Sequence, residues 1–503
     1  MTSAELLDVA MCRLRLPVPM AKLQVIHQVA GALKNERTGA ATWQALLRWL
    51  RALTLESEVL EALAIVVAAR GAPVLSSADL RASINAPSAL SDAFIGHAFG
   101  TPVLVHSWLK GHSGEAPRFY QRPELRDELA RGQIVPRALV LSLQDLQQES
   151  GRPFIAQWTF EFERLIEHTD SSSDSHFSFF LPESDRGEVG QFVARRGQLA
   201  RSAFLRTLAL AADIWDMSIA EAQAAAMVAS PADLSLLPML PGGVPGWVVP
   251  LHGARPGAPE EVARLAASVL REVQEAEAKS LLHLNLPLHG DVRYNCELEI
   301  VSILSSGEAI DAEEVFRVHD FLPGRMYVPR AEDLTLRIDA LDRQATFPAK
   351  AGGRLRPVLL PLVGNRVGYL QSDLVSRMPC LPAHESQSPL IAISREGGAD
   401  VLLSGTKVGE LLHWNWRWRP THPKHMGGPT GVALVLDRDV TRRLLHVDGM
   451  RLCHVWRARV LKRATDYGDW REEVWHGSVL GIGLESTTVI GSRHGTSDTV
   501  NLG

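Results

Sequence analysis

The chain lacks several features that would point directly to a function. Its 503 residues include only four cysteines, which are widely spaced and form no C-x-x-C pair: Cys12, Cys296, Cys380 and Cys453. Neither a disulfide framework nor a cysteine-based zinc site is therefore expected. No apolar run approaches the roughly eighteen residues that cross a bilayer, and the first residues have no signal-peptide pattern. These absences predict a reduced, cytoplasmic protein with no membrane contact.

Motifs for nucleotide and cofactor binding are also missing. The chain contains neither G-x-x-x-x-G-K-[ST] nor G-x-G-x-x-G, which excludes a P-loop and a dinucleotide-binding turn of the usual kind. The run Gly111-His112-Ser113-Gly114 matches a nucleophile elbow only in part, because Glu115 stands where the second glycine is needed. We expect no cofactor, and the absence of a complete catalytic motif favours a protein that is not an enzyme.

The composition is that of a folded protein with no dominant charge. Hydrophobic residues make up 46% of the chain and charged residues 22%, values that permit a large core. The formal net charge of −5 excludes a nucleic-acid footprint over the whole chain, although a local basic patch is compatible with it.

Hydrophobic periodicity predicts an α+β multidomain protein, with a helical N-terminal half followed by a β-rich C-terminal half. Apolar residues recur at three- and four-residue spacing in the first part, as in helical hairpins or a solenoid, whereas strand-length runs separated by turns follow residue 290. We divide the chain into a helical domain (1–100), a mixed and mainly helical region (101–230), a Pro/Gly-rich linker with a long helix (231–290) and a β-rich C-terminal domain (291–503).

Three local predictions can be compared directly with a structure. Ser218 followed by Glu221 is a capping-box signature for the start of a helix. The apolar run 138–143 has strand length, and the amphipathic pattern of 259–282 predicts one long helix.

The most prominent chemical feature is a region rich in tryptophan and arginine. Six of the twelve tryptophans lie between Trp414 and Trp475, and residues 401–475 contain thirteen Lys/Arg against eight Asp/Glu. Indoles stack on unpaired bases and arginines neutralise phosphates, but tryptophan and arginine also dominate protein-interface hot spots. Alternatively, the tryptophans fill a β core. The candidate binding residues are Trp414, Trp416, Arg417, Trp418, Arg419, Trp456, Arg457 and Arg459.

Alternation places these side chains on opposite faces of their strands. Trp414, Trp416 and Trp418 share one face and Arg417 and Arg419 the other, so we favour a core role for the indoles and partner contact for the arginines.

In the run 454–463, cationic side chains fall on both faces. A strand buried on both faces would not tolerate these cations, so this pattern predicts a strand at an edge or rim.

Metal ligation is a weaker hypothesis. His413, His422 and His425 cluster in the sequence, and Asp437 could complete a tetrahedral zinc set, although Pro423 prevents a regular helix between the last two histidines.

Carboxylates suggest a second kind of metal site. Asp291, Glu297 and Glu299 approximate a nuclease arrangement, but Glu299 occupies the position of the required lysine. Asp437 and Asp439 form another pair at a strand end.

The chain combines a helical N-terminal half and a β-rich C-terminal half, and it lacks a complete active site. In these respects it resembles the large subunits that bacteria encode within multigene assemblies. The resemblance implies a non-catalytic subunit that scaffolds or regulates an assembly through its Trp/Arg-rich C-terminal surface. Anti-phage defence is one setting for such an assembly, although no residue specifies it. The alternatives are a metal-dependent hydrolase or nuclease and a single-stranded nucleic-acid-binding protein.

Overall fold

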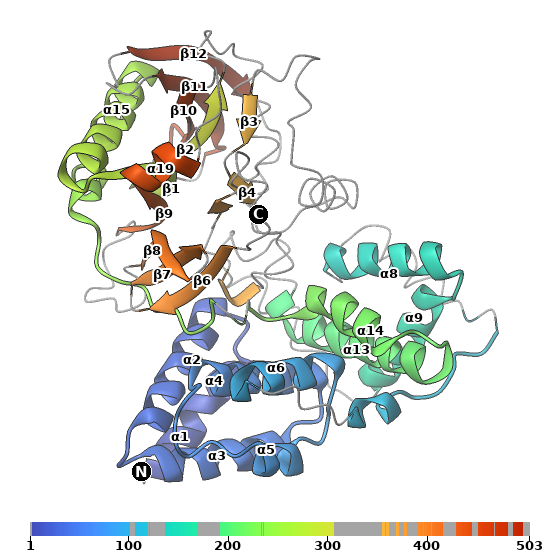
Figure 1. Cartoon of the computed structure of the whole chain (residues 1–503). Helices are drawn as coiled ribbons and strands as arrows, with labels where there is room; N and C mark the ends of the chain where they lie inside the picture. Colours follow the sequence, from blue (N-terminus) through green and yellow to red (C-terminus); the bar gives the residue numbers. More distant parts are fainter. Residues whose placement is uncertain are drawn as a thin grey trace.

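The computed structural model shows an α+β protein in which helices form the N-terminal half and an antiparallel sheet forms the C-terminal half (Figure 1). The structure describes residues 3–100, 106–118, 120, 136–167, 192–232, 234, 236–305, 355–357, 359–361, 369–371, 377–379, 390–395, 397–403, 405–415, 429–444, 451–466, 468–480 and 486–495. The predicted change from a helical to a β-rich half is confirmed.

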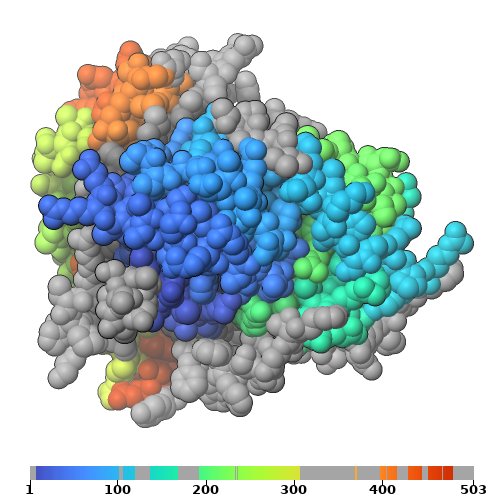
Figure 2. Space-filling view, turned by 90° about the horizontal axis from the view of Figure 1, so that it is seen from below, coloured from blue at the N-terminus to red at the C-terminus, as the bar shows by residue number. Residues whose placement is uncertain are grey.

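Ten described α-helices build the first half, and four of them, α2, α3, α6 and α13, pack around the almost completely buried α4. Together they enclose one hydrophobic core, so the described parts of the predicted 1–100 and 101–230 regions pack as one body. Figure 2 shows them as one continuous face. The helices are α1 (Ser3–Cys12), α2 (Pro19–Lys34), α3 (Gly39–Ala52), α4 (Glu56–Ala68), α5 (Ser77–Ser83), α6 (Ala89–Phe99), α8 (Arg137–Ser150), α9 (Phe154–Glu167), α13 (Arg195–Ile214) and α14 (Ile219–Ala226).

Two of the local predictions concern these helices. The capping box is confirmed: the Ser218 hydroxyl accepts from the Glu221 N–H, and the Glu221 carboxylate accepts from the Ser218 N–H. The strand prediction for 138–143 is wrong, because this run lies in α8. Leu139, Leu143 and Leu146 continue at helical spacing, and a short apolar run alone does not separate a strand from a buried helix.

The second half is a ten-stranded sheet among the described residues, with the order β12-β11-β10-β2-β1-β9-β8-β7-β6 and with β3 beside β2. All of its pairings are antiparallel. The strands are β1 (Lys279–Gly290), β2 (Tyr294–Ser305), β3 (Leu355–Pro357), β6 (Leu390–Arg395), β7 (Gly398–Leu403), β8 (Thr406–Asn415), β9 (Thr430–Asp437), β10 (Arg451–Lys462), β11 (Arg471–Leu480) and β12 (Ser486–Gly495); β4 (Leu359–Pro361) and β5 (Arg377–Pro379) form a separate pair.

Helix α15 (Pro259–Ala276) packs on one face of this sheet (Figure 1), and the short α19 (Arg438–Leu444) follows β9. Residues of α15 share a core with indoles of three strands: Trp414, Trp456 and Trp475. The predicted helix 259–282 is therefore too long, since it ends at Ala276 and Lys279 already begins β1. The alternation of Leu284, Leu286 and Leu288 was the strand signal that the helical pattern obscured.

The edge-strand prediction for 454–463 is also wrong, because β10 lies between β2 and β11. The arginines of β10 are tolerated there because neighbouring strands supply carboxylates. Arg457 donates to Glu299 of β2 at 2.9 Å, and Arg459 donates to Glu472 of β11 at 2.5 Å. Such cross-strand ion pairs satisfy charges that an interior strand could not otherwise carry.

The two halves are joined by main-chain contacts and by an inserted side chain. Gly242 forms a parallel bridge with Trp414, and its N–H donates to the His413 carbonyl at 2.9 Å. Tyr369, in a short 3-10 turn (Tyr369–Gln371), is completely buried in the core of the helical half. The Leu370 N–H next to it donates to the carbonyl of Pro231 at 2.9 Å. Residues distant in sequence therefore hold the halves together.

We expect Gly242→Ala to destabilise the protein by about 1–3 kcal/mol, the usual range for overpacking. A Cβ atom on Gly242 would lie 2.5 Å from the Cα atom of Gly397, which is far inside van der Waals contact. Gly243→Ala is the matched control, since no atom lies within 4 Å of its added Cβ. Urea denaturation of both variants measures the difference, and equal midpoints would show that the contact with Gly397 relaxes freely.

Candidate binding site on the C-terminal sheet

The structure divides the candidate tryptophans and arginines into buried and undescribed groups. Trp414 is 1% exposed and Trp456 is 0% exposed, and both pack against the α15 side of the sheet. For these two residues the geometry is that of a core. Trp416, Arg417, Trp418 and Arg419 lie outside the described residues, so the proposed partner contact of the two arginines stays a prediction.

The described arginines of the candidate set, Arg457 and Arg459, lie on the other face of the sheet. Glu299, which receives the hydrogen bond from Arg457, is 3% exposed and also lies 3.6 Å from the Nε2 atom of His283. The register aligns Glu299, Arg457 and His476 in one row across three strands. The charge of Arg457 is therefore paired with Glu299 in this row. It is less available to a ligand than the sequence pattern suggested.

The carboxylates considered for a nuclease site do not converge. Asp291 precedes β2 and Glu299 lies eight residues further along an extended strand, a separation on the order of 25 Å. Glu299 is paired with Arg457, while Glu297 on the same face is exposed.

The histidine hypothesis is only partly covered by the structure. His413 is buried in β8, and Asp437 is exposed at the end of β9. His422 and His425 lie outside the described residues. Asp439 lies in the first turn of α19, with its side chain 89% exposed. Within the described ranges, no three His, Cys, Asp or Glu side chains are grouped closely enough to hold a metal ion.

The partial nucleophile elbow has a different geometry from the one its sequence suggested. A short 3-10 helix (Ser107–Lys110) precedes it, and the Ser113 hydroxyl donates to Glu161 at 2.7 Å rather than to a histidine. His112 contacts Asp213 through Nε2 at 3.2 Å, while its Nδ1 accepts from the Gly114 N–H. Since neither ring nitrogen of His112 is turned to Ser113, this loop is held to α9 and α13 without forming a catalytic triad.

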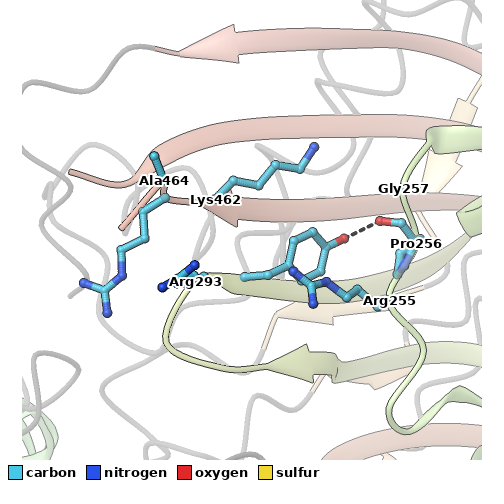
Figure 3. A pocket seen from close by; sticks show the side chains of 8 residues that line it. Arg255, Pro256, Gly257, Arg293, Lys462 and Ala464 are labelled. Atoms are coloured by element: carbon cyan, nitrogen blue, oxygen red, sulfur yellow. Dashed lines mark hydrogen bonds between the residues drawn. The ribbon is translucent and has the colours of Figure 1, made fainter. Parts of the chain in front are cut away.

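A basic cavity lies at the end of the sheet where β1 turns into β2 and β10 ends (Figure 3). Its volume is about 450 Å³. Four cationic side chains line it and come from three segments of the chain, and we call this site the basic pocket. The cations are Arg255, Arg293, Lys462 and Arg463; the other lining residues are Pro256, Gly257, Tyr294 and Ala464.

The turn between β1 and β2 places one of these cations. The Asp291 carboxylate accepts from the backbone N–H groups of Arg293 and Tyr294, each at 2.7 Å, as in an Asx turn. The hydrogen bond from the Arg293 N–H is the main cause that lowers the pKa of Asp291 to about 2, with further help from His289. The charged form of Asp291 therefore holds the turn closed over the neutral pH range.

Aromatic rings contact two of the arginines in the pocket. The Arg255 guanidinium sits 4.9 Å from the ring centre of Tyr294, and the Arg463 guanidinium sits 4.5 Å from that of Trp470. Burial raises the pKa of the Tyr294 hydroxyl, which stays protonated and donates to the Pro256 carbonyl. These contacts fix the wall of the pocket between residues 255–257 and β2.

Three carboxylates partly balance the four cations. Asp466 accepts from Arg293 at 2.5 Å, Glu473 pairs with Lys462 at 3.1 Å, and Asp291 lies 3.7 Å from Arg255. Arg463 has no ion-pair partner among the described residues; its Nε donates instead to the Val292 carbonyl.

Sequence reasoning missed this pocket as a unit. The Lys462-Arg463 pair ends the cationic run 454–463. Arg255 and Arg293 belong to a Pro/Gly-rich segment and a hairpin turn, and no local pattern predicts that these two segments lie close together. The one available clue was the aspartate two residues before Arg293, which is typical of a tight turn.

Comparison with known proteins adds no assignment. No protein-family model matches the chain, and no curated protein is similar to it. Among the described helices, none combines the length and the apolar character required to span a bilayer.

Proposed function

We propose that this protein is a non-catalytic cytoplasmic subunit that scaffolds or regulates a multi-protein bacterial assembly, and that it contacts its partner through the basic pocket and the surface around it. The observation that supports this proposal is the grouping of four cations at one end of the sheet, three of which contact aromatic rings. Arginine and aromatic side chains are the residues that most often dominate the energy of protein interfaces. The basic pocket is an additional candidate contact site on this half, and the partner contact of Arg417 and Arg419 stays a prediction.

The contacts between the two halves are compatible with a scaffolding role. Tyr369 and the Gly242–Trp414 bridge tie the sheet to the helical core, so a partner bound at the sheet is held at a fixed position relative to the helices. The pocket itself is smaller than a stable interface, which buries about 800 Å² on each partner. It therefore serves as the anchor of a larger contact with an acidic partner surface.

The test is quantitative co-purification of the full-length tagged chain from its own host. We expect Arg293→Glu combined with Arg463→Glu to reduce the yield of a stoichiometric partner about tenfold or more, because it reverses two charges at the anchor. The matched control reverses Arg442 and Arg443, two exposed arginines of α19 near the opposite end of β1. Circular dichroism confirms that both variants are folded. Equal partner yields from the two double variants would contradict the proposal.

Single-stranded nucleic-acid binding is the second candidate, favoured by the contact between Arg463 and the half-buried indole of Trp470. Cations interleaved with aromatic rings are typical of surfaces that track a strand. This function predicts an affinity that falls steeply with salt concentration and a loss of binding in Trp470→Ala. Oligonucleotide binding that is insensitive to salt would exclude it.

A further inference from the structure

The hydrogen bonds of two arginines in the basic pocket leave their outer nitrogens available. Arg293 donates to Asp466 through Nε, and Arg463 donates to the Val292 carbonyl, also through Nε. The Nη1 and Nη2 atoms of both guanidinium groups make no hydrogen bond to any described residue. Each side chain is thus fixed at its inner nitrogen while its outer N–H groups are uncommitted.

The main chain holds these two arginines close together. The Arg463 N–H donates to the Arg293 carbonyl at 3.0 Å, which makes the two residues direct neighbours across the ends of β2 and β10. Arg255 and Lys462 complete the lining, and their aromatic contacts limit the positions that they can adopt. The cationic groups are therefore set in place by the fold before any ligand arrives.

This chemistry matches a phosphate group better than it matches a carboxylate. The outer N–H pairs of two arginines can each bind two oxygens of one anion, and a phosphate has enough oxygens for both. Three carboxylates already pair with Arg255, Arg293 and Lys462, so Arg463 supplies most of the uncompensated positive charge. The match to phosphate therefore depends on its number of oxygens and not on its total charge. A volume of about 450 Å³ is within the range of small-molecule sites and exceeds what phosphate alone requires.

We infer that the basic pocket binds the phosphate group of a small phosphorylated ligand, with Arg293 and Arg463 as its principal anchors and Arg255 and Lys462 at its sides. The inference rests on the proposed function in that it uses the same pocket. It adds a ligand class, because a phosphorylated small molecule bound there would compete with an acidic partner. The ligand would then control whether the partner is held.

Calorimetric titration of the full-length chain tests this inference. The probes are inorganic phosphate, pyrophosphate and adenosine monophosphate, with adenosine as the control that lacks a phosphate, all at one ionic strength. We expect saturable binding of at least one phosphorylated probe, no binding of adenosine, and about tenfold or greater weakening in Arg293→Gln combined with Arg463→Gln. Arg442→Gln combined with Arg443→Gln should bind as the unchanged chain does.

The inference is overturned if no phosphorylated probe binds, or if the Arg293/Arg463 variant binds as tightly as the control variant. An oligonucleotide provides a further arm, with and without a 5′-phosphate. Binding that is indifferent to the terminal phosphate and grows with strand length would assign the pocket to a nucleic-acid backbone instead. Failure of phosphate binding while partner capture still depends on Arg293 and Arg463 would remove this inference and leave the proposed function standing.

Discussion

Replacing Glu61 with glutamine is expected to destabilise the protein by about 3–5 kcal/mol, the usual cost of removing one partner from a buried ion pair. Glu61 is 1% exposed and accepts hydrogen bonds from Lys22 at 2.5 Å, Arg201 at 3.2 Å and Tyr369 at 2.6 Å. Burial alone would raise the pKa of Glu61, but the charges of Lys22 and Arg201 outweigh it and lower that pKa. The ionised carboxylate is therefore the counter-charge of this network.

The consequence of its loss falls mainly on Arg201. Its guanidinium is completely buried, and arginine side chains are not deprotonated in proteins. Burial is the main influence on Lys22 and lowers the pKa of its ammonium group, which can therefore lose its proton when its partner is removed. Arg201 has no such escape, so the glutamine variant retains a buried charge without a carboxylate.

Urea denaturation followed by far-ultraviolet circular dichroism measures this effect. Glu36→Gln is the control, because Glu36 is an exposed carboxylate in the same half and should change the free energy of unfolding by less than about 0.5 kcal/mol. Tyr369→Phe removes only the hydroxyl between Glu61 and Arg201, and we expect a smaller loss of about 1–3 kcal/mol. Denaturation midpoints of Glu61→Gln and Glu36→Gln that coincide would show that the network contributes nothing to stability.

The second large effect is expected for Trp456→Ala, at about 3–5 kcal/mol of destabilisation. The Trp456 indole is completely buried between the sheet and α15, and its truncation would leave a cavity in that core. Trp470→Ala is the control, since this half-buried indole contacts Arg463 of the basic pocket and is not part of the core. Thermal unfolding of both variants separates a core role from a binding role. Unchanged stability of Trp456→Ala would restore the hypothesis that this tryptophan is a binding platform.

The sequence predicted the division into a helical and a β-rich half because periodicity is a local property. It also separated Trp456 correctly from Arg457 and Arg459, since alternation alone assigns the faces of a strand. The edge-strand prediction for 454–463 failed because residues distant in the sequence pair with this run. The partner of Arg457 is Glu299, 158 residues away, and this ion pair, together with that of Arg459 and Glu472, lets the run lie in an interior strand.

No local sequence pattern predicts the Glu61 network or the basic pocket. Tyr369 donates a hydrogen bond to Glu61, which lies 308 residues away in the sequence, and no pattern around either residue predicts this contact. The basic pocket likewise assembles residues near 255, 293 and 463. By contrast, the capping box of α14 was predictable because Ser218 and Glu221 lie within one helical turn. Sequence patterns therefore identified elements and caps, while long-range pairing defined the network and the pocket.

The central claim is that the basic pocket is the anchor for a partner. Hydrogen–deuterium exchange of the purified assembly, compared with the free chain, tests it most directly. The account predicts slower exchange on partner binding in residues 253–258, 291–295 and 462–466, the segments that line or border the pocket. Protection confined to the helical face of Figure 2, with unchanged exchange in these three segments, would contradict it.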